Sequence, residues 1–178
     1  MSGPTIVPWN GILPTIHPSA FIAPTAVVIG DTHIGPESNI WFGCVLRGDI
    51  NRIRVGARVN LQDGSVVHVS GNAPCEIGDE VSIGHMALVH GCTLQPGCFI
   101  GMKACVMDRA VVETGAMVGA GALVTPGKVV PTGELWAGSP ASHMRAITEK
   151  DLKEFARVSA SYADRGAKYR EILAAAAS

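Results

Sequence analysis

The chain has 178 residues and a net charge of −1, with 16% charged and 5% aromatic residues. This length allows one domain with a sizeable core, and the 21 glycines favour many short strands joined by turns over a helical bundle. The sequence contains no basic run and no continuous apolar stretch of about 18 residues, so we expect neither a nucleic-acid partner nor a membrane span.

The N-terminal segment, Met1 to Leu13, contains prolines but no basic residue, which argues against a secretory signal. The five cysteines show no Cys-x-x-Cys spacing. We therefore expect reduced thiols in a cytoplasmic protein, with Cys44 and Cys98 serving as small buried residues.

From Ile16 onward, apolar residues recur at every sixth position, and the residue two places earlier is usually small. This period is typical of a β-solenoid, whereas an antiparallel sandwich spaces its strands by about 8–12 residues without a fixed period. The pattern resembles that of hexapeptide-repeat proteins, in which three hexapeptides form one coil of a left-handed parallel β-helix. The apolar ladder consists of Ile16, Ile22, Val28, Ile34, Ile40, Leu46, Val55, Leu61, Val67, Ile77, Ile83, Val89, Leu94, Ile100, Val106, Val112, Val118, Val124, Val130 and Trp136.

Extra residues interrupt the period at two places, after Leu46 and after Val67. The second interruption predicts a loop near Ser70 to Pro74, because residues outside the repeat must leave the stacked coils.

The ladder ends at Trp136, and a helical pattern begins at Thr148, whose side chain and following acidic residues are typical of a helix start. We predict a C-terminal α-helix from Thr148 to about Ala175, with Gly166 as a candidate break. The predicted architecture is all-β: a left-handed β-helix with a short N-terminal extension over residues 1–141. Residues 142–178 form a linker and a helix packed on the β-helix, within the same structural unit.

Three histidines occupy related places on this lattice. Leu46, Val67 and Val89 stack one coil apart, so the residues that follow them, Arg47, His68 and His90, form one outward column. Neighbouring strands lie about 4.8 Å apart, which lets two imidazoles bind one ion through bonds of about 2.0–2.1 Å.

His85 follows Ile83 by two positions, which predicts that it lies on the preceding face, round a corner from His90. Asp63 occupies the equivalent place one coil earlier. A neighbouring subunit in a threefold ring could therefore bring its His85 to the His68–His90 pair. Three histidines with an open fourth position are typical of a catalytic zinc site. A single histidine is more often a surface or core residue, and His17, His33 and His143 show no such relation.

These residues resemble the γ-class carbonic anhydrase family over nearly the whole chain, from about Pro14 to the C-terminal helix. The matching strings are Arg47-Gly48-Asp49, Asn60-Leu61-Gln62-Asp63-Gly64, His68, Ile83-Gly84-His85, His90-Gly91-Cys92, Ile100-Gly101-Met102 and Gly138-Ser139-Pro140-Ala141. The resemblance implies a homotrimer that hydrates carbon dioxide reversibly to bicarbonate by a metal-bound hydroxide between subunits. It implies His68, His85 and His90 as metal ligands, with His85 from a neighbour. The metal would be Zn²⁺, although Co²⁺ or Fe²⁺ also suits three imidazoles.

The resemblance also implies roles for residues around the metal. Arg47 and Asp63 would be polar partners near the site and across the interface, where a purely structural salt bridge is an equal alternative. Gln62 would orient the metal-bound water or the substrate, and Asp49 and Asn60 would belong to the surrounding hydrogen-bond network. Tyr162, on the C-terminal helix, would lie near the metal.

The chain departs from the family pattern where some members carry proton-transfer glutamates. One of those places holds Ile50, and the other falls in the Val69–Pro74 segment, which has no acid. The rate of hydration and the route of the proton are therefore open.

Three alternatives remain from the sequence. One is a metal-dependent thioesterase, another hydrolase or an accessory protein on the same scaffold. The second is a catalytically inactive, metal-stabilised trimer. The third is a hexapeptide acyltransferase, which would leave the stacked pair of His68 and His90 unexplained.

Overall fold

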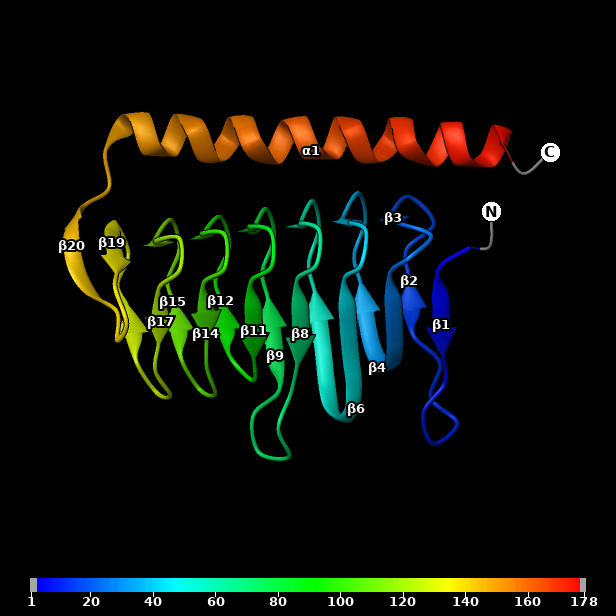
Figure 1. Ribbon diagram of the computed structural model, residues 1–178, viewed down its shortest axis with the longest axis horizontal. Coiled ribbons are helices and arrows are strands. Elements are labelled where there is room, and N and C mark those ends of the chain that lie inside the picture. The colour runs from blue at the N-terminus through cyan, green and yellow to red at the C-terminus, as the bar shows by residue number, and fades with distance from the viewer. Residues whose placement is uncertain (1–2, 177–178) are drawn as a thin grey trace.

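The computed structural model, which describes residues 3–176, is a prism of stacked parallel strands with one long helix, α1 (Glu149–Ala175), lying along it (Figure 1). The strands occupy three faces, because each coil of the chain contributes a short strand to every face and then turns a corner. The predicted fold, a left-handed parallel β-helix with a C-terminal helix, is confirmed.

The face under α1, here called the helix face, ends in an antiparallel strand, β20, while all its other strands are parallel. Its strands in chain order are β3 (Phe21–Ile22), β5 (Asn39–Ile40), β7 (Asn60–Leu61), β10 (Ser82–Ile83), β13 (Phe99–Ile100), β16 (Met117–Val118), β19 (Glu134–Ala137) and β20 (Ser142–Ala146).

The second face, here called the site face, and the third face share two long strands, β4 and β6, which bend from one face to the next. The site face contains β1 (Thr5–Val7), β4 (Val27–Ile34), β6 (Val45–Val55), β8 (Val66–His68), β11 (Leu88–His90), β14 (Cys105–Val106) and β17 (Leu123–Val124). The third face contains β2 (Thr15–Ile16), the second parts of β4 and β6, β9 (Cys75–Ile77), β12 (Thr93–Leu94), β15 (Val111–Val112) and β18 (Val129–Val130).

The apolar ladder fills the inside of the prism. Val67, Ile83 and Val89 are all 0% exposed, and the small residue two places before a ladder position, such as Cys44, is also fully buried. Side chains alternate between the two sides of a strand, so the residues that flank each ladder position point outward. The ladder therefore fixes which residues reach the surface in each coil.

Both interruptions of the period project from the prism at the edge away from α1 (Figure 1). The extra residues after Leu46 lengthen β6, and those after Val67 form the loop predicted near Ser70 to Pro74. Ser70 and Ala73 close that loop with two backbone hydrogen bonds of 3.1 Å. The two insertions touch, because the Asn51 side-chain amide donates to the Ser70 carbonyl at 3.1 Å.

Helix α1 begins where the sequence predicts. Thr148 is the N-cap, and its side chain and that of Asp151 form a reciprocal capping box. The break considered at Gly166 is wrong, since α1 runs through it without interruption. Gly166 is buried, and a Cβ there would lie 3.0 Å from the Cβ of Asn39. The glycine thus lets the helix approach β5 closely instead of ending the helix.

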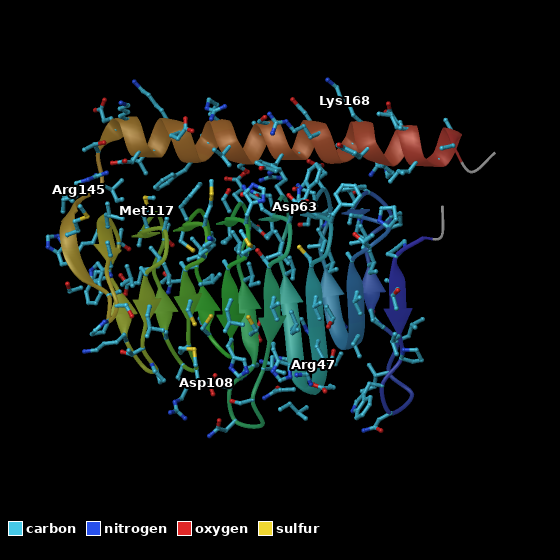
Figure 2. The ribbon with its side chains drawn as sticks, in the orientation of Figure 1. Arg47, Asp63, Asp108, Met117, Arg145 and Lys168 are labelled. Carbon is cyan, nitrogen blue, oxygen red and sulfur yellow. The ribbon has the colours of Figure 1, made fainter. Side chains whose placement is uncertain are left out.

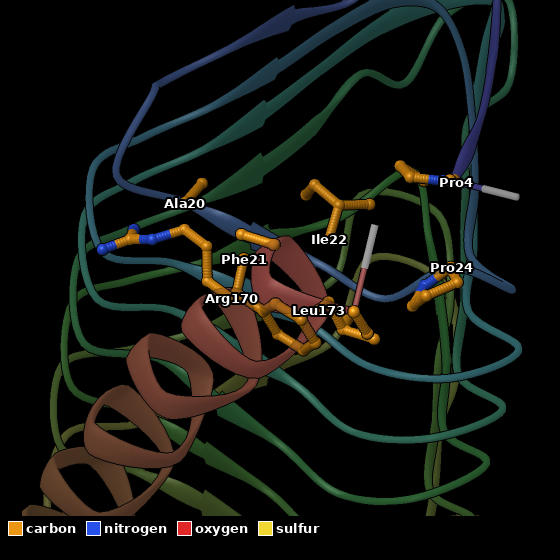
Figure 3. Close-up of a pocket in the computed structure, with 10 residues that line it drawn as sticks. Pro4, Ala20, Phe21, Ile22, Pro24, Arg170 and Leu173 are labelled. Atoms are coloured by element: carbon orange, nitrogen blue, oxygen red, sulfur yellow. The ribbon is translucent and has the colours of Figure 1, made fainter. Parts of the chain in front are cut away.

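The C-terminal end of α1 lies over the first coil and leaves a mostly apolar hollow of about 420 Å³ (Figure 3). Phe21, Ile22 and Pro24 line it from the coil, and Arg170 and Leu173 line it from the helix. Within residues 3–176, no helix combines the length and apolar character needed to cross a membrane.

Replacing Gly166 with leucine should loosen α1, because the larger side chain cannot fit against Asn39 and Phe21. We expect faster amide hydrogen exchange along the helix, measured by mass spectrometry. Ala156→Leu, at an exposed position of the same helix, is the matched control and should leave exchange unchanged. Equal protection in both variants would contradict this account of Gly166.

Candidate metal centre

A column of three polar side chains crosses the site face at its edge away from α1. In the parallel register, Arg47 of β6 lies beside His68 of β8, and His68 lies beside His90 of β11. Figure 2 shows Arg47 at this edge, and Asp108, which contacts His90, lies at the same edge. The predicted stacking of positions 47, 68 and 90 is therefore present in the fold.

His68 and His90 are close enough to share an ion. His68 Nδ1 lies 3.0 Å from His90 Nε2, and the ring centroids are 5.0 Å apart. Both side chains are largely shielded, at 15% and 24% exposure. The other nitrogen of each ring meets a carboxylate: His68 Nε2 lies 3.1 Å from Asp49 Oδ1, and His90 Nδ1 contacts Asp108 Oδ1.

Asp49 is held from two sides. Burial opposes its ionisation, but hydrogen bonds from Arg47 and His68 outweigh that effect and lower the pKa of the Asp49 carboxyl. Arg47 thus contacts Asp49 within one subunit, whereas Asp63, its predicted partner across the interface, lies at the opposite edge of the site face (Figure 2).

Asp108 was not predicted from the sequence. The hydrogen bond from His90 lowers the pKa of its carboxyl, and the Ser70 hydroxyl, which donates to Asp108 Oδ2 at 2.8 Å, acts in the same direction. The strand register could have indicated this contact. Met107 follows Val106 and occupies the place in the column of His90 one coil later, and Asp108 is the next residue.

His85 lies in the corner turn between β10 and β11, rather than on the preceding face itself. Its Nδ1 is 3.0 Å from Asp63 Oδ2, and its Nε2 is 3.4 Å from the Tyr162 hydroxyl of α1. His85 and His90 are five positions apart in the chain, and the corner turn at His85 places the two residues at opposite ends of the segment that ends in β11 (Leu88–His90). Accordingly, no group of three potential ligands that could hold a metal occurs among residues 3–176 of a single chain.

Gln62 and Asn60 belong to the His85 side of the molecule. Gln62 Nε2 donates to Asn60 Oδ1 at 3.1 Å, and Asn60 Nδ2 donates to the Ser82 hydroxyl at 2.6 Å. This buried network fixes the amide plane of Gln62, which lines a cleft of about 440 Å³ between the helix face and α1. His85, Met102 and Tyr162 also line the cleft.

Tyr162 is held by aromatic packing. Its ring meets that of Trp41 edge to face at a centroid distance of 5.4 Å, and the Arg165 guanidinium lies 5.3 Å above it. Burial raises the pKa of the Tyr162 phenol. The helix thus carries a protonated phenol to the side of His85 that does not contact Asp63.

The donor chemistry fits a tetrahedral metal. Each of the three histidines has one ring nitrogen next to a carboxylate. Because a carboxylate only accepts hydrogen bonds, the nitrogen next to it must carry the hydrogen. The opposite nitrogens of His68 and His90 then present lone pairs to each other. Bonds of about 2.0–2.1 Å to a tetrahedral ion would separate two ligand nitrogens by about 3.3 Å. The observed 3.0 Å is close to that value.

Comparison with known proteins identifies the family. A carbonic anhydrase of Geobacillus kaustophilus is 43% identical over 167 residues, covering 94% of this chain and 92% of the relative. The chain belongs to the γ-carbonic anhydrase family. Mitochondrial γ-carbonic anhydrase 1 of Arabidopsis thaliana is 47% identical over 85% of this chain, which spans 57% of that relative's length. No family model matches the chain.

Solved structures place the chain among hexapeptide-repeat proteins, as the γ-carbonic anhydrase assignment requires. A hexapeptide transferase family protein from Anaplasma phagocytophilum superposes with a TM-score of 0.89 and 45% identity, covering 93% of this chain and 98% of that one. A Bacillus cereus protein superposes with a TM-score of 0.95 and 37% identity, covering 96% and 99% of the two chains.

Proposed function

We propose that this chain is a metal-dependent carbonic anhydrase that hydrates carbon dioxide reversibly to bicarbonate, with His68 and His90 of one subunit and His85 of a neighbour as ligands. The family membership supports the reaction class. The observation that carries the site is the 3.0 Å approach of His68 Nδ1 and His90 Nε2, with a carboxylate behind each ring.

A threefold homotrimer is proposed because the histidines lie at opposite edges of the site face. One edge presents the His68–His90 pair, and the other presents His85 together with Asp63. If the first edge of each subunit meets the second edge of the next, a closed ring of three contains three equivalent sites. The same contact would bring Arg47 of one subunit near Asp63 of its neighbour.

Zinc, or another divalent metal that accepts three imidazoles, supplies a Lewis acid that activates water at neutral pH. The chain's own groups prepare the site. Asp49 fixes the Nε2–H tautomer of His68, and Asp63 fixes the Nδ1–H tautomer of His85. Gln62, held by Asn60, orients substrate or water from the cleft, and the Tyr162 hydroxyl adds a donor beside His85.

Proton release is assigned to small buffer molecules. Ile50, which follows Asp49, is 57% exposed and cannot carry a proton. The Val69–Pro74 loop beside His90 contains no acid. We also propose a reducing compartment such as the cytoplasm, which is supported by five cysteine thiols, four of them buried.

Zinc-loaded protein should accelerate carbon dioxide hydration in a stopped-flow assay with a pH indicator. His85→Ala should fall to the buffer background, because the proposed site then lacks a ligand. His143→Ala removes an exposed histidine outside the column and should keep wild-type activity. Metal-loaded wild-type protein that hydrates carbon dioxide no faster than His85→Ala would overturn the proposal.

A second candidate, thioester hydrolysis, is favoured by the cleft beside His85. Its volume of about 440 Å³ is larger than carbon dioxide needs. Its lining by Phe99, Met102 and Met117 suits an apolar acyl group. The same zinc-loaded sample distinguishes the two. Hydrolysis of an acyl thioester without carbon dioxide hydration would replace the first function with the second.

A further inference from the structure

Asp108 contacts a proposed ligand from outside the column that defines the site. It lies in the corner turn after β14, one coil beyond His90. The backbone of this turn is fixed on both sides, because Arg109 N–H donates to the Gly91 carbonyl at 2.7 Å and Gly127 N–H donates to the Asp108 carbonyl at 2.9 Å. The carboxylate is therefore held by neighbouring coils and not by a mobile chain end.

The two oxygens of Asp108 have different partners. Oδ1 accepts from His90 Nδ1, and Oδ2 accepts from the Ser70 hydroxyl at 2.8 Å. Ser70 belongs to the loop that interrupts the repeat, and the Asn51 amide holds that loop through the Ser70 carbonyl at 3.1 Å. A continuous set of hydrogen bonds thus runs from the β6 insertion through the loop to His90.

Close packing around position 91 requires a glycine there. Gly91 has a φ of +53°, and a Cβ there would lie 2.9 Å from Asp108 Oδ1 and 2.9 Å from the Cβ of Ala73. A side chain at position 91 would push the loop and the carboxylate apart. The glycine therefore allows the Val69–Pro74 loop, Asp108 and His90 to meet.

We propose that Asp108, fixed by Ser70, is a positioning residue that sets the Nδ1–H tautomer and the ring orientation of His90. The ring then needs no rotation to present the lone pair of Nε2, the atom that faces His68, to the metal. The Val69–Pro74 loop, which has no acid, thus helps to align His90 through the hydrogen bond from Ser70 to Asp108. This inference rests on the proposed function, because it assigns His90 to a metal.

The test measures zinc affinity by competition with a chromophoric chelator on the assembled protein. Asp108→Ala should weaken zinc binding by about 10–100-fold, the range usual for loss of a ligand's hydrogen-bond partner. Asp108→Asn should recover part of the loss, because its amide oxygen can still accept from Nδ1. Asp79→Asn is the matched control, since Asp79 accepts a backbone N–H in a turn at another corner and should bind zinc as wild type does.

Ser70→Ala should weaken zinc binding by a few-fold in the wild-type background and have no further effect on zinc binding beside Asp108→Ala, since in this proposal the serine reaches His90 through that carboxylate. Cobalt-loaded Asp108→Ala should also show altered visible absorption bands, which a purely structural role would not change.

Unchanged zinc affinity in Asp108→Ala, with or without a lower melting temperature, would overturn the inference and leave the proposed function standing. Wild-type protein that takes up no metal would overturn both.

Discussion

His85→Ala should bind no metal at any of the three proposed sites while keeping its coils folded. The side chain is 32% exposed and lies in a corner turn, outside the buried ladder, so its removal leaves the core intact. Its loss would nevertheless deprive every site of one ligand, since in the proposed trimer each subunit supplies the third imidazole to its neighbour. Elemental analysis of the purified protein, with circular dichroism as the test of folding, measures both effects. One metal per subunit in this variant would contradict the ligand assignment.

Complementation between variants tests whether each site is shared. His68→Ala and His85→Ala should each fail to bind metal alone, but co-expressed subunits should recover about a quarter of the wild-type sites if they mix at random in a ring. A recovered site needs an intact His68–His90 pair from one variant and an intact His85 from the other. Co-expression of His68→Ala with His90→Ala is the matched control and should recover nothing, since both changes fall on the same half of the site.

Ile83→Ala should destabilise the protein by about 2–5 kcal/mol, the usual cost of removing a large buried aliphatic side chain. Ile83 is 0% exposed and pairs in register with Leu61 on one side and Ile100 on the other. The neighbouring coils are hydrogen-bonded in fixed register, so they cannot move inward to fill the resulting cavity. Chemical denaturation measures the free energy of unfolding, and the protein concentration is held fixed because the proposed trimer would make stability depend on it.

Ile172→Ala is the control for this prediction. Ile172 is 61% exposed on α1, so the same chemical change should alter stability by less than about 0.5 kcal/mol. Equal losses from the two substitutions would show that ladder burial does not dominate the stability of the coils.

The apolar period predicted most of the fold because one repeated physical requirement generates it. Every coil must bury its ladder residue, so Val67 and Val89 follow directly from the spacing, as does the loop where the spacing fails. Strand β20 has no such period and was expected to be part of a linker. Helix propensity alone predicts a break at Gly166, whereas the close packing of this residue against Asn39 keeps the helix continuous.

The parts of the candidate site that depend on strand register could be predicted from the sequence. The parts that depend on how far a side chain extends could not. The positions of His68 and His90 follow from counting coils. The contact of Asp108 with His90 was missed because it requires a side chain in a corner turn to reach the preceding coil. The contact of Tyr162 with His85 depends on how α1 lies over the helix face, and the resemblance suggested only that this tyrosine lies near the metal.

Helix α1 packs against coils that are distant from one another along the chain. A repeat array in which each coil touches only its neighbours can lose its end coils one by one. Here a rod of 27 residues, about 40 Å long, spans seven parallel rungs that occupy about 30 Å. Phe155 stacks on Phe99 at 4.8 Å, and Tyr169 packs on Phe21 of the first coil at 5.8 Å. Fraying of the first coil must therefore also detach the C-terminal part of α1, and this coupling makes the array a single cooperative unit.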